Sequence, residues 1–68
     1  MEKISITTEY IKLDQLLKLS GITYSGSEAK EFILEGKVTV NGNVETQRGK
    51  KLRKGDIIKF RERVLQLE

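Results

Sequence analysis

The chain contains no cysteine and no histidine. Without cysteine it forms no disulfide and offers no thiolate to a metal or a substrate. Without histidine it lacks the commonest general base near neutral pH and a usual zinc ligand. These absences count against most zinc and nucleophilic enzymes, and we expect neither a metal nor a cofactor.

Long apolar runs are also missing. The longest cover a few residues, whereas a membrane helix needs about 20 and the core of a signal peptide about 7 to 15. We therefore expect a cytoplasmic protein without membrane contact. With 68 residues there is room for one domain and one small core, so we predict a single domain over residues 1–68.

No set of residues typical of an active site is recognisable. The six glycines form neither a G-x-x-x-x-G-K-[ST] nor a G-x-G-x-x-G phosphate loop. Glu31 and Glu35, four residues apart, have the spacing of a metal or acid–base pair, but beside Lys30 they fit a solvated helix surface better. Ser25 fits a helix cap better than a nucleophile. We expect no catalysis and no small-molecule substrate.

The rest of the fold is organised around the stretch from Ser25 to Gly42. Ser25 followed by Glu28 is a capping-box pattern, which predicts a helix start with the Glu28 carboxylate on the Ser25 N–H. The next apolar residues recur at helical spacing and share one face: Ala29, Phe32 and Ile33. Gly36 is placed to end the helix in a left-handed conformation.

A hairpin follows this helix. Val38–Val40 alternates apolar and polar residues, and Asn41-Gly42 predicts a type I′ turn, which needs positive φ at both positions. Asn43–Glu45 is predicted to form the short second arm of this hairpin. Thr46–Gly55 reads as an ordered loop pinned by its one apolar residue, Leu52.

The remaining elements complete an α+β order. We predict a first strand over Lys3–Thr7, a helix over Tyr10–Ser20 ended by Gly21, and last strands over Ile57–Phe60 and Val64–Leu67. The two adjacent helices should form a compact pair on a small antiparallel sheet. Among the aromatic residues, Phe32 and Phe60 fit the core. Ile22 and Tyr24 should pack in the connection between the helices, although Tyr24 could instead stack on a base.

Positive charge is concentrated in the last part of the chain. Residues 1–40 hold five Lys or Arg and six Asp or Glu, whereas residues 41–68 hold eight and four. Five cations fall in one seven-residue segment: Arg48, Lys50, Lys51, Arg53 and Lys54. Cations on a short loop straddle successive phosphates and release their counterions, which favours nucleic acid. A solubilising surface remains the simpler alternative.

Three segments resemble the blocks of the S-four domain, the alpha-L RNA-binding module. They are K-L-D-Q-L-L-K-L-S-G-I at 12–22, S-G-S-E-A-K-E-F-I-L-E-G-K-V-T-V-N-G at 25–42 and K-L-R-K-G-D-I-I-K-F at 51–60. The resemblance covers about residues 10–60, with the blocks in the family's order. The short length, the first strand and the R-G-K-K-L-R-K-G-D segment make the chain most similar to the small bacterial YaaA-type proteins.

The resemblance implies a helix pair on a small bent antiparallel sheet, with an RNA surface made by the helix pair and the following loops. Together with the charge pattern it gives nine candidate RNA-binding residues: Lys12, Ser27, Lys30, Lys37, Arg48, Lys50, Lys51, Arg53 and Lys54. Gly26 stands where many members have Arg. Because three glutamates also lie on the second helix, we expect Lys30 to be its one strong cation.

The function that this implies is binding of structured RNA, ribosomal or transfer RNA, through phosphate and shape contacts in ribosome assembly or translation. Two alternatives stay open. One is a protein–protein adaptor on a ribosome-associated factor. The other is a β-grasp sulfur carrier, which the two consecutive helices and the absence of a C-terminal Gly-Gly oppose.

Overall fold

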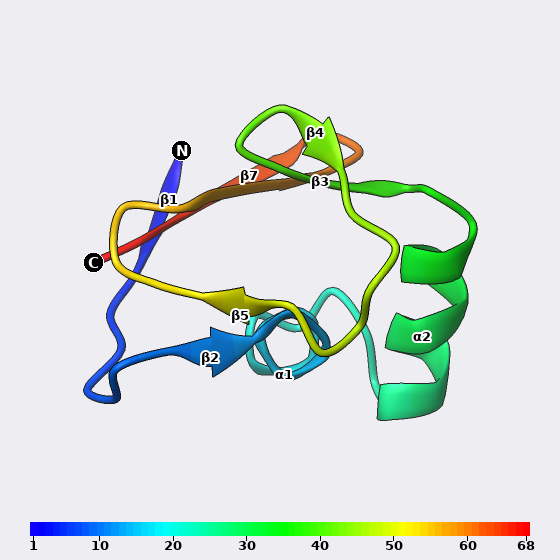
Figure 1. Ribbon diagram of the computed structural model, residues 1–68, viewed down its shortest axis with the longest axis horizontal. Helices are drawn as coiled ribbons and strands as arrows, with labels where there is room; N and C mark the ends of the chain where they lie inside the picture. Colours follow the sequence, from blue (N-terminus) through cyan, green and yellow to red (C-terminus); the bar gives the residue numbers. More distant parts are fainter.

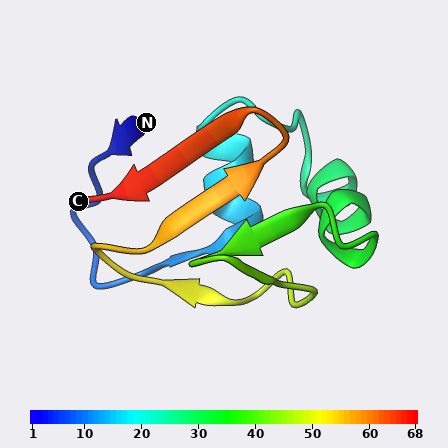
Figure 2. The ribbon, with the colours of Figure 1, turned by 90° about the horizontal axis from the view of Figure 1, so that it is seen from above.

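The computed structural model describes residues 1–68 and shows two layers (Figure 1). A five-stranded sheet lies over helix α1 and a two-stranded ribbon, and helix α2 stands at one end of both (Figure 2). The helices are α1 (Leu13–Leu19) and α2 (Gly26–Leu34). The strands are β1 (Glu2–Ile4), β2 (Ile11–Lys12), β3 (Val38–Val40), β4 (Asn43–Val44), β5 (Lys51–Leu52), β6 (Ile57–Phe60) and β7 (Arg63–Leu67). The predicted α+β class is confirmed.

The five-stranded sheet has the order β1-β7-β6-β3-β4 and is mixed. Neighbouring strands pair antiparallel except β1, which pairs parallel to β7 with Ile4 opposite Leu67. The prediction of an antiparallel sheet was therefore wrong at this edge. Antiparallel neighbours can be joined by a tight turn, but β1 and β7 are joined by almost the whole chain, so no turn sets their direction.

The core lies between the sheet and the helices. Strand alternation turns one side chain in two inward, and helical spacing gives each helix one buried face. The 13 residues of the core are Ile6, Leu13, Leu16, Leu17, Ala29, Ile33, Val38, Val40, Leu52, Ile58, Phe60, Leu65 and Leu67. In the stripe predicted for the second helix, Ala29 and Ile33 are buried as expected, whereas Phe32 is only partly buried against the core. The pinning role of Leu52, which is fully buried, is confirmed.

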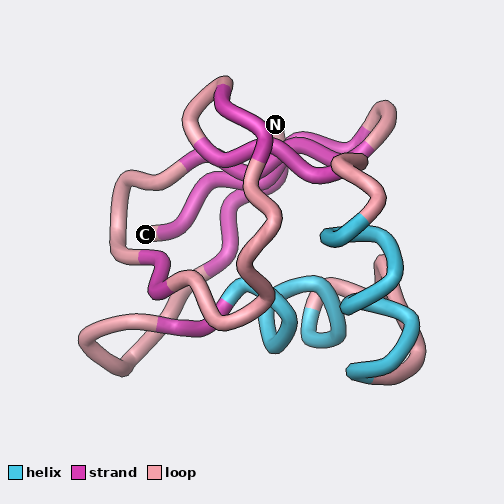
Figure 3. Tube along the Cα trace, turned by 45° about the vertical axis from the view of Figure 1, so that its right-hand side comes forward, coloured by secondary structure: helices cyan, strands magenta, loops and turns pink.

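The ribbon of β2 and β5 was missed in the sequence. The helix predicted over Tyr10–Ser20 begins only at Leu13, because Ile11 and Lys12 pair antiparallel with Leu52 and Lys51. The paired residues are 41 and 39 positions apart in the chain, so no local pattern indicates the pairing. The segment between β4 and β5 is a loop that descends from the sheet layer to the helix layer (Figure 3).

Other boundaries shift by smaller amounts. The first strand, predicted over Lys3–Thr7, is Glu2–Ile4, although Ile6 is buried as its pattern indicated. The last strand starts at Arg63 instead of Val64. Neither helix is long and apolar enough to cross a membrane.

The predicted turn and cap chemistry is largely confirmed. Asn41 and Gly42 have φ of 52° and 86°, as a type I′ turn requires, and Gly36 ends α2 with φ of 74°. The Ser25 hydroxyl accepts the Glu28 N–H at 3.2 Å. The reciprocal bond is displaced by one residue, because the Glu28 carboxylate accepts the N–H of Tyr24 at 3.1 Å instead of that of Ser25.

Candidate nucleic-acid interface

The basic loop, defined as residues 48–54, is held against the start of α1 by backbone hydrogen bonds. The Leu13 N–H donates to the carbonyl of Lys50 at 2.9 Å, and the Asp14 N–H donates to that of Arg48 at 3.0 Å. The pairing of Lys12 with Lys51 continues this contact. Two hydrogen bonds and one strand pairing therefore fix where the loop presents its cations.

This docking also closes the N-terminus of α1. The first amides of a helix have no partner within the helix and attract anions when they are free. In α1 the two loop carbonyls take the first two amides, and the Asp14 carboxylate accepts the Gln15 N–H at 2.9 Å. In α2 the amides of Gly26 and Ser27 have no backbone partner. The start of α2 is thus the one open helix N-terminus.

A groove of about 360 Å³ separates the basic loop from the β3–β4 hairpin. Lys50, Lys51 and Arg53 line one side of it, and Asn41 and Asn43 line the other. The groove brings together cations and amide groups, which are suited to phosphate and sugar oxygens, and its lining also includes the carboxylates of Glu45 and Asp56.

The cations of the loop are free of intramolecular ion pairs. The chain forms two ion pairs, Lys37 with Glu35 at 3.2 Å and Arg63 with Glu2 at 2.6 Å. Hydrogen bonding in the second pair lowers the pKa of Glu2 and raises that of Arg63. The charge of the loop is therefore available to a ligand.

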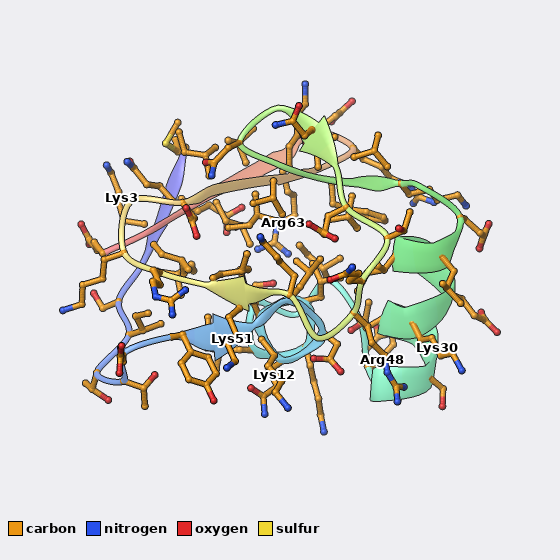
Figure 4. The ribbon with its side chains drawn as sticks, viewed as in Figure 1. Lys3, Lys12, Lys30, Arg48, Lys51 and Arg63 are labelled. Carbon is orange, nitrogen blue, oxygen red and sulfur yellow. The ribbon has the colours of Figure 1, made fainter.

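Four of the labelled cations lie along the same lower edge in Figure 4. They are Lys12, Lys51, Arg48 and Lys30, and they come from β2, β5, the loop before β5, and α2. Lys3 and Arg63 lie higher in the same view, at the level of the sheet.

Comparison with known proteins identifies the family of this chain. The sequence profile of the S4 domain matches residues 4–68. The chain belongs to the S4 domain family. This is the S-four family that the three sequence blocks resemble, and the β-grasp alternative is set aside.

Two relatives of this S4 domain are bacterial proteins of similar length. It is 46% identical to "Probable ribosome maturation protein RlbA" of Bacillus subtilis (strain 168), over 84% of this chain and 80% of that protein. It is 43% identical to YbcJ of Escherichia coli (strain K12), over 75% and 73% respectively. The solution structure of E. coli YbcJ, described as an alfaL motif involved in RNA-binding, superposes with a TM-score of 0.74 at 37% identity, over 98% of this chain and 86% of that one.

Within this S4 domain, the nine predicted site residues fall into separate places. Lys12, Arg48, Lys50 and Lys51 are joined by the contacts of the basic loop with α1 and β2. Arg53 joins Lys50 and Lys51 at the groove. Ser27 and Lys30 are exposed on the first turns of α2, and Lys54 is exposed at the far end of the loop.

Lys37 does not join these residues. Its ammonium pairs with Glu35 and lies 5.5 Å from the centre of the Phe32 ring. The Arg61 guanidinium lies 5.9 Å from the same ring. These contacts group Lys37 with the end of α2 and the β6–β7 turn of the S4 domain, and not with the basic loop.

The two tyrosines differ from what the sequence indicated. Tyr24, expected to pack, is 91% exposed beside the open start of α2. Tyr10 lies beside the basic loop, with Lys51 Nζ 4.9 Å from the centre of its ring. Sequence reasoning missed this contact because it depends on the pairing of β2 with β5.

Proposed function

We propose that this S4 domain binds structured RNA, ribosomal or transfer RNA, through its phosphates and its shape, in ribosome assembly or translation. The observation that carries the proposal is the basic loop: a cluster of cations without ion pairs, fixed by backbone bonds to α1 and by strand pairing with β2.

The rigidity of the loop favours phosphate binding. Lysine and arginine side chains lose rotamer freedom on binding, and a mobile backbone would add a further ordering cost. Here the backbone of the loop is already ordered by its contacts with α1. Each phosphate that these cations neutralise releases condensed counterions, so affinity should fall steeply with salt.

The start of α2 supplies a second contact of a different kind. The free amides of Gly26 and Ser27 and the positive end of the helix dipole favour a phosphate oxygen. Lys30 stands one turn further along the same helix. Contacts from two elements to one RNA backbone read the shape of the RNA more than its sequence.

The side chains that could suggest catalysis have structural roles instead. The Ser25 hydroxyl caps α2, and the Glu35 carboxylate pairs with Lys37. We infer that the domain binds RNA without chemically changing it. The names of its relatives support the proposal, since RlbA is named for ribosome maturation and the YbcJ motif is described as involved in RNA-binding.

The test compares two pairs of charge reversals with the same net charge. Lys50→Glu/Lys51→Glu alters the basic loop, and Lys3→Glu/Lys59→Glu alters β1 and β6 in the sheet layer. Affinity for folded ribosomal RNA fragments and for transfer RNA is measured across salt concentrations, with circular dichroism to confirm the fold.

We expect the loop variant to lose affinity about tenfold or more, and the slope of log affinity against log salt to fall by about two. The control variant should lose much less. Equal losses in both variants would show that only net charge matters. Absence of salt-dependent binding by the unaltered chain would refute the function itself.

A further inference from the structure

A second groove runs beside α1 and is lined by none of the nine candidate RNA-binding residues. It is shallow and open to solvent, has a volume of about 730 Å³, and is lined by Thr8, Tyr10, Ile11, Gln15, Lys18 and Leu19. Its apolar side chains remain open to solvent, with Leu19 64% and Tyr10 36% exposed. The volume lies in the range of small-molecule and nucleotide sites.

The groove adjoins the basic loop. The Tyr10 ring, on its rim, is in contact with the Lys51 ammonium. Ile11 in its wall precedes Lys12, which is paired with Lys51 in the ribbon. An apolar groove and two unpaired cations therefore meet at Tyr10.

The backbone around Tyr10 is fixed. The Thr8 hydroxyl donates to the carbonyl of Tyr10 at 2.8 Å, and the next residue, Ile11, pairs with the buried Leu52. An aromatic side chain on an ordered backbone loses little entropy when a ligand stacks on it.

We propose that this groove receives an unpaired base of the bound RNA, stacked on Tyr10, with the adjoining phosphate held by Lys12 and Lys51. The proposal rests on the function given above and names a feature of the RNA: at least one nucleotide outside the paired helix. A nucleotide combines a flat, largely apolar base with an anionic phosphate.

The polar residues of the groove fit the same ligand. Gln15 has both a donor and an acceptor for the edge of a base, and Lys18 adds a donor. No carboxylate lines the groove, so nothing in it opposes an anion. An apolar peptide would use Tyr10, Ile11 and Leu19 but would leave the cations at the rim without a partner.

The chain offers a close control for the groove. Leu34, on α2, is 60% exposed and lies outside it, whereas Leu19 is 64% exposed and lines it. Leu19→Ala and Leu34→Ala therefore remove the same side chain at similar exposure. Tyr10→Phe keeps the ring that Tyr10→Ala removes.

The probe is an RNA hairpin closed by a non-nucleotide linker, so that a single bulged 2-aminopurine is its one unpaired nucleotide. It is compared with the same linker-closed hairpin without the bulge. Fluorescence reports stacking of the base, and a salt titration gives affinity for both RNAs. We expect quenching with the unaltered chain and with Tyr10→Phe. With Tyr10→Ala the quenching should be lost. Affinity for the hairpin with the unpaired base should fall about tenfold, and affinity for the hairpin without it should stay nearly constant.

Leu19→Ala should weaken binding of the unpaired hairpin more than Leu34→Ala does. Equal affinity of the unaltered chain for both hairpins, without quenching, would overturn the inference while leaving the proposed function intact, as would equal losses for both hairpins in Tyr10→Ala. Failure to bind either hairpin, or any folded RNA, would instead refute the proposed function on which the inference rests.

Discussion

The side chains of Asn41 and Asp56 join the hairpin turn to the end of the basic loop. The Asn41 amide donates to Asp56 Oδ1 at 3.0 Å, and Asp56 Oδ2 accepts the N–H of Arg53 at 2.8 Å. The Asn41 amide oxygen also accepts the N–H of Ile57 at 2.9 Å. One asparagine in the turn therefore helps to fix both the β6 strand and a cation of the loop.

Replacing Asn41 should destabilise the fold. Asn41→Ala loses the side-chain hydrogen bonds. It also places alanine at φ of 52°, a left-handed conformation that alanine adopts less readily than asparagine. Together we expect these effects to lower the free energy of unfolding by about 2 kcal/mol. Asn41→Gly loses the same bonds but accepts the positive φ, so it should cost about 1 kcal/mol. Urea unfolding measures both values. Equal losses would assign the whole effect to the side-chain bonds.

Gly26→Arg should increase RNA affinity. Nothing lies within 4 Å of where a Cβ would stand, so the larger side chain fits at the open start of α2. One added cation beside Lys30 should tighten binding about threefold to tenfold and steepen the salt slope by about one. Gly26→Ala is the control for helix effects. An unchanged salt slope would mean that this helix start lies away from the RNA.

Thr23→Val should stabilise the domain. Thr23 is 2% exposed, and its hydroxyl has no hydrogen-bond partner, so a buried polar atom is left unsatisfied. Valine has nearly the same shape without that hydroxyl, and we expect about 1 kcal/mol of added stability in thermal or urea unfolding. The N–H of Thr23, which donates to the Leu17 carbonyl, is unaffected. If Thr23→Val destabilised the domain, the Thr23 hydroxyl would have to form a hydrogen bond in the folded protein.

The pair of Glu2 and Arg63 should make a small, pH-dependent contribution that anchors β1. Hydrogen bonding to Arg63 holds the pKa of Glu2 below its ordinary value of 4.5 in the folded chain. The stabilisation is therefore present at neutral pH and is lost as the pH falls below 4.5 through the folded pKa. The pair is exposed, so salt should weaken it. Glu2→Gln should lower the melting temperature slightly at pH 7 and leave it unchanged in acid; a pH-independent difference would argue against the ion pair.

Several features could be predicted from the sequence because they depend on neighbouring residues. The cap at Ser25, the type I′ turn at Asn41-Gly42 and the buried Leu52 follow from local backbone geometry and spacing, and each is confirmed. Family membership followed from the order of three short blocks and is also confirmed. The clustered cations of residues 48–54 could be read directly, although their role in RNA binding stays a prediction.

What the sequence did not reveal depends on residues far apart in the chain. The pairing of Ile11 with Leu52 shortened the first helix and created the contact between Tyr10 and Lys51. The parallel edge strand, the separation of Lys37 from the loop and the exposure of Tyr24 likewise depend on which elements meet. Local sequence determined the two helices, the β3–β4 hairpin with its turn, and the charge of this S4 domain, but not the β2–β5 ribbon. Which cations share a surface was decided only by the packing of the two layers. Burial of the common core brings distant segments together, and their surface side chains become neighbours as a result.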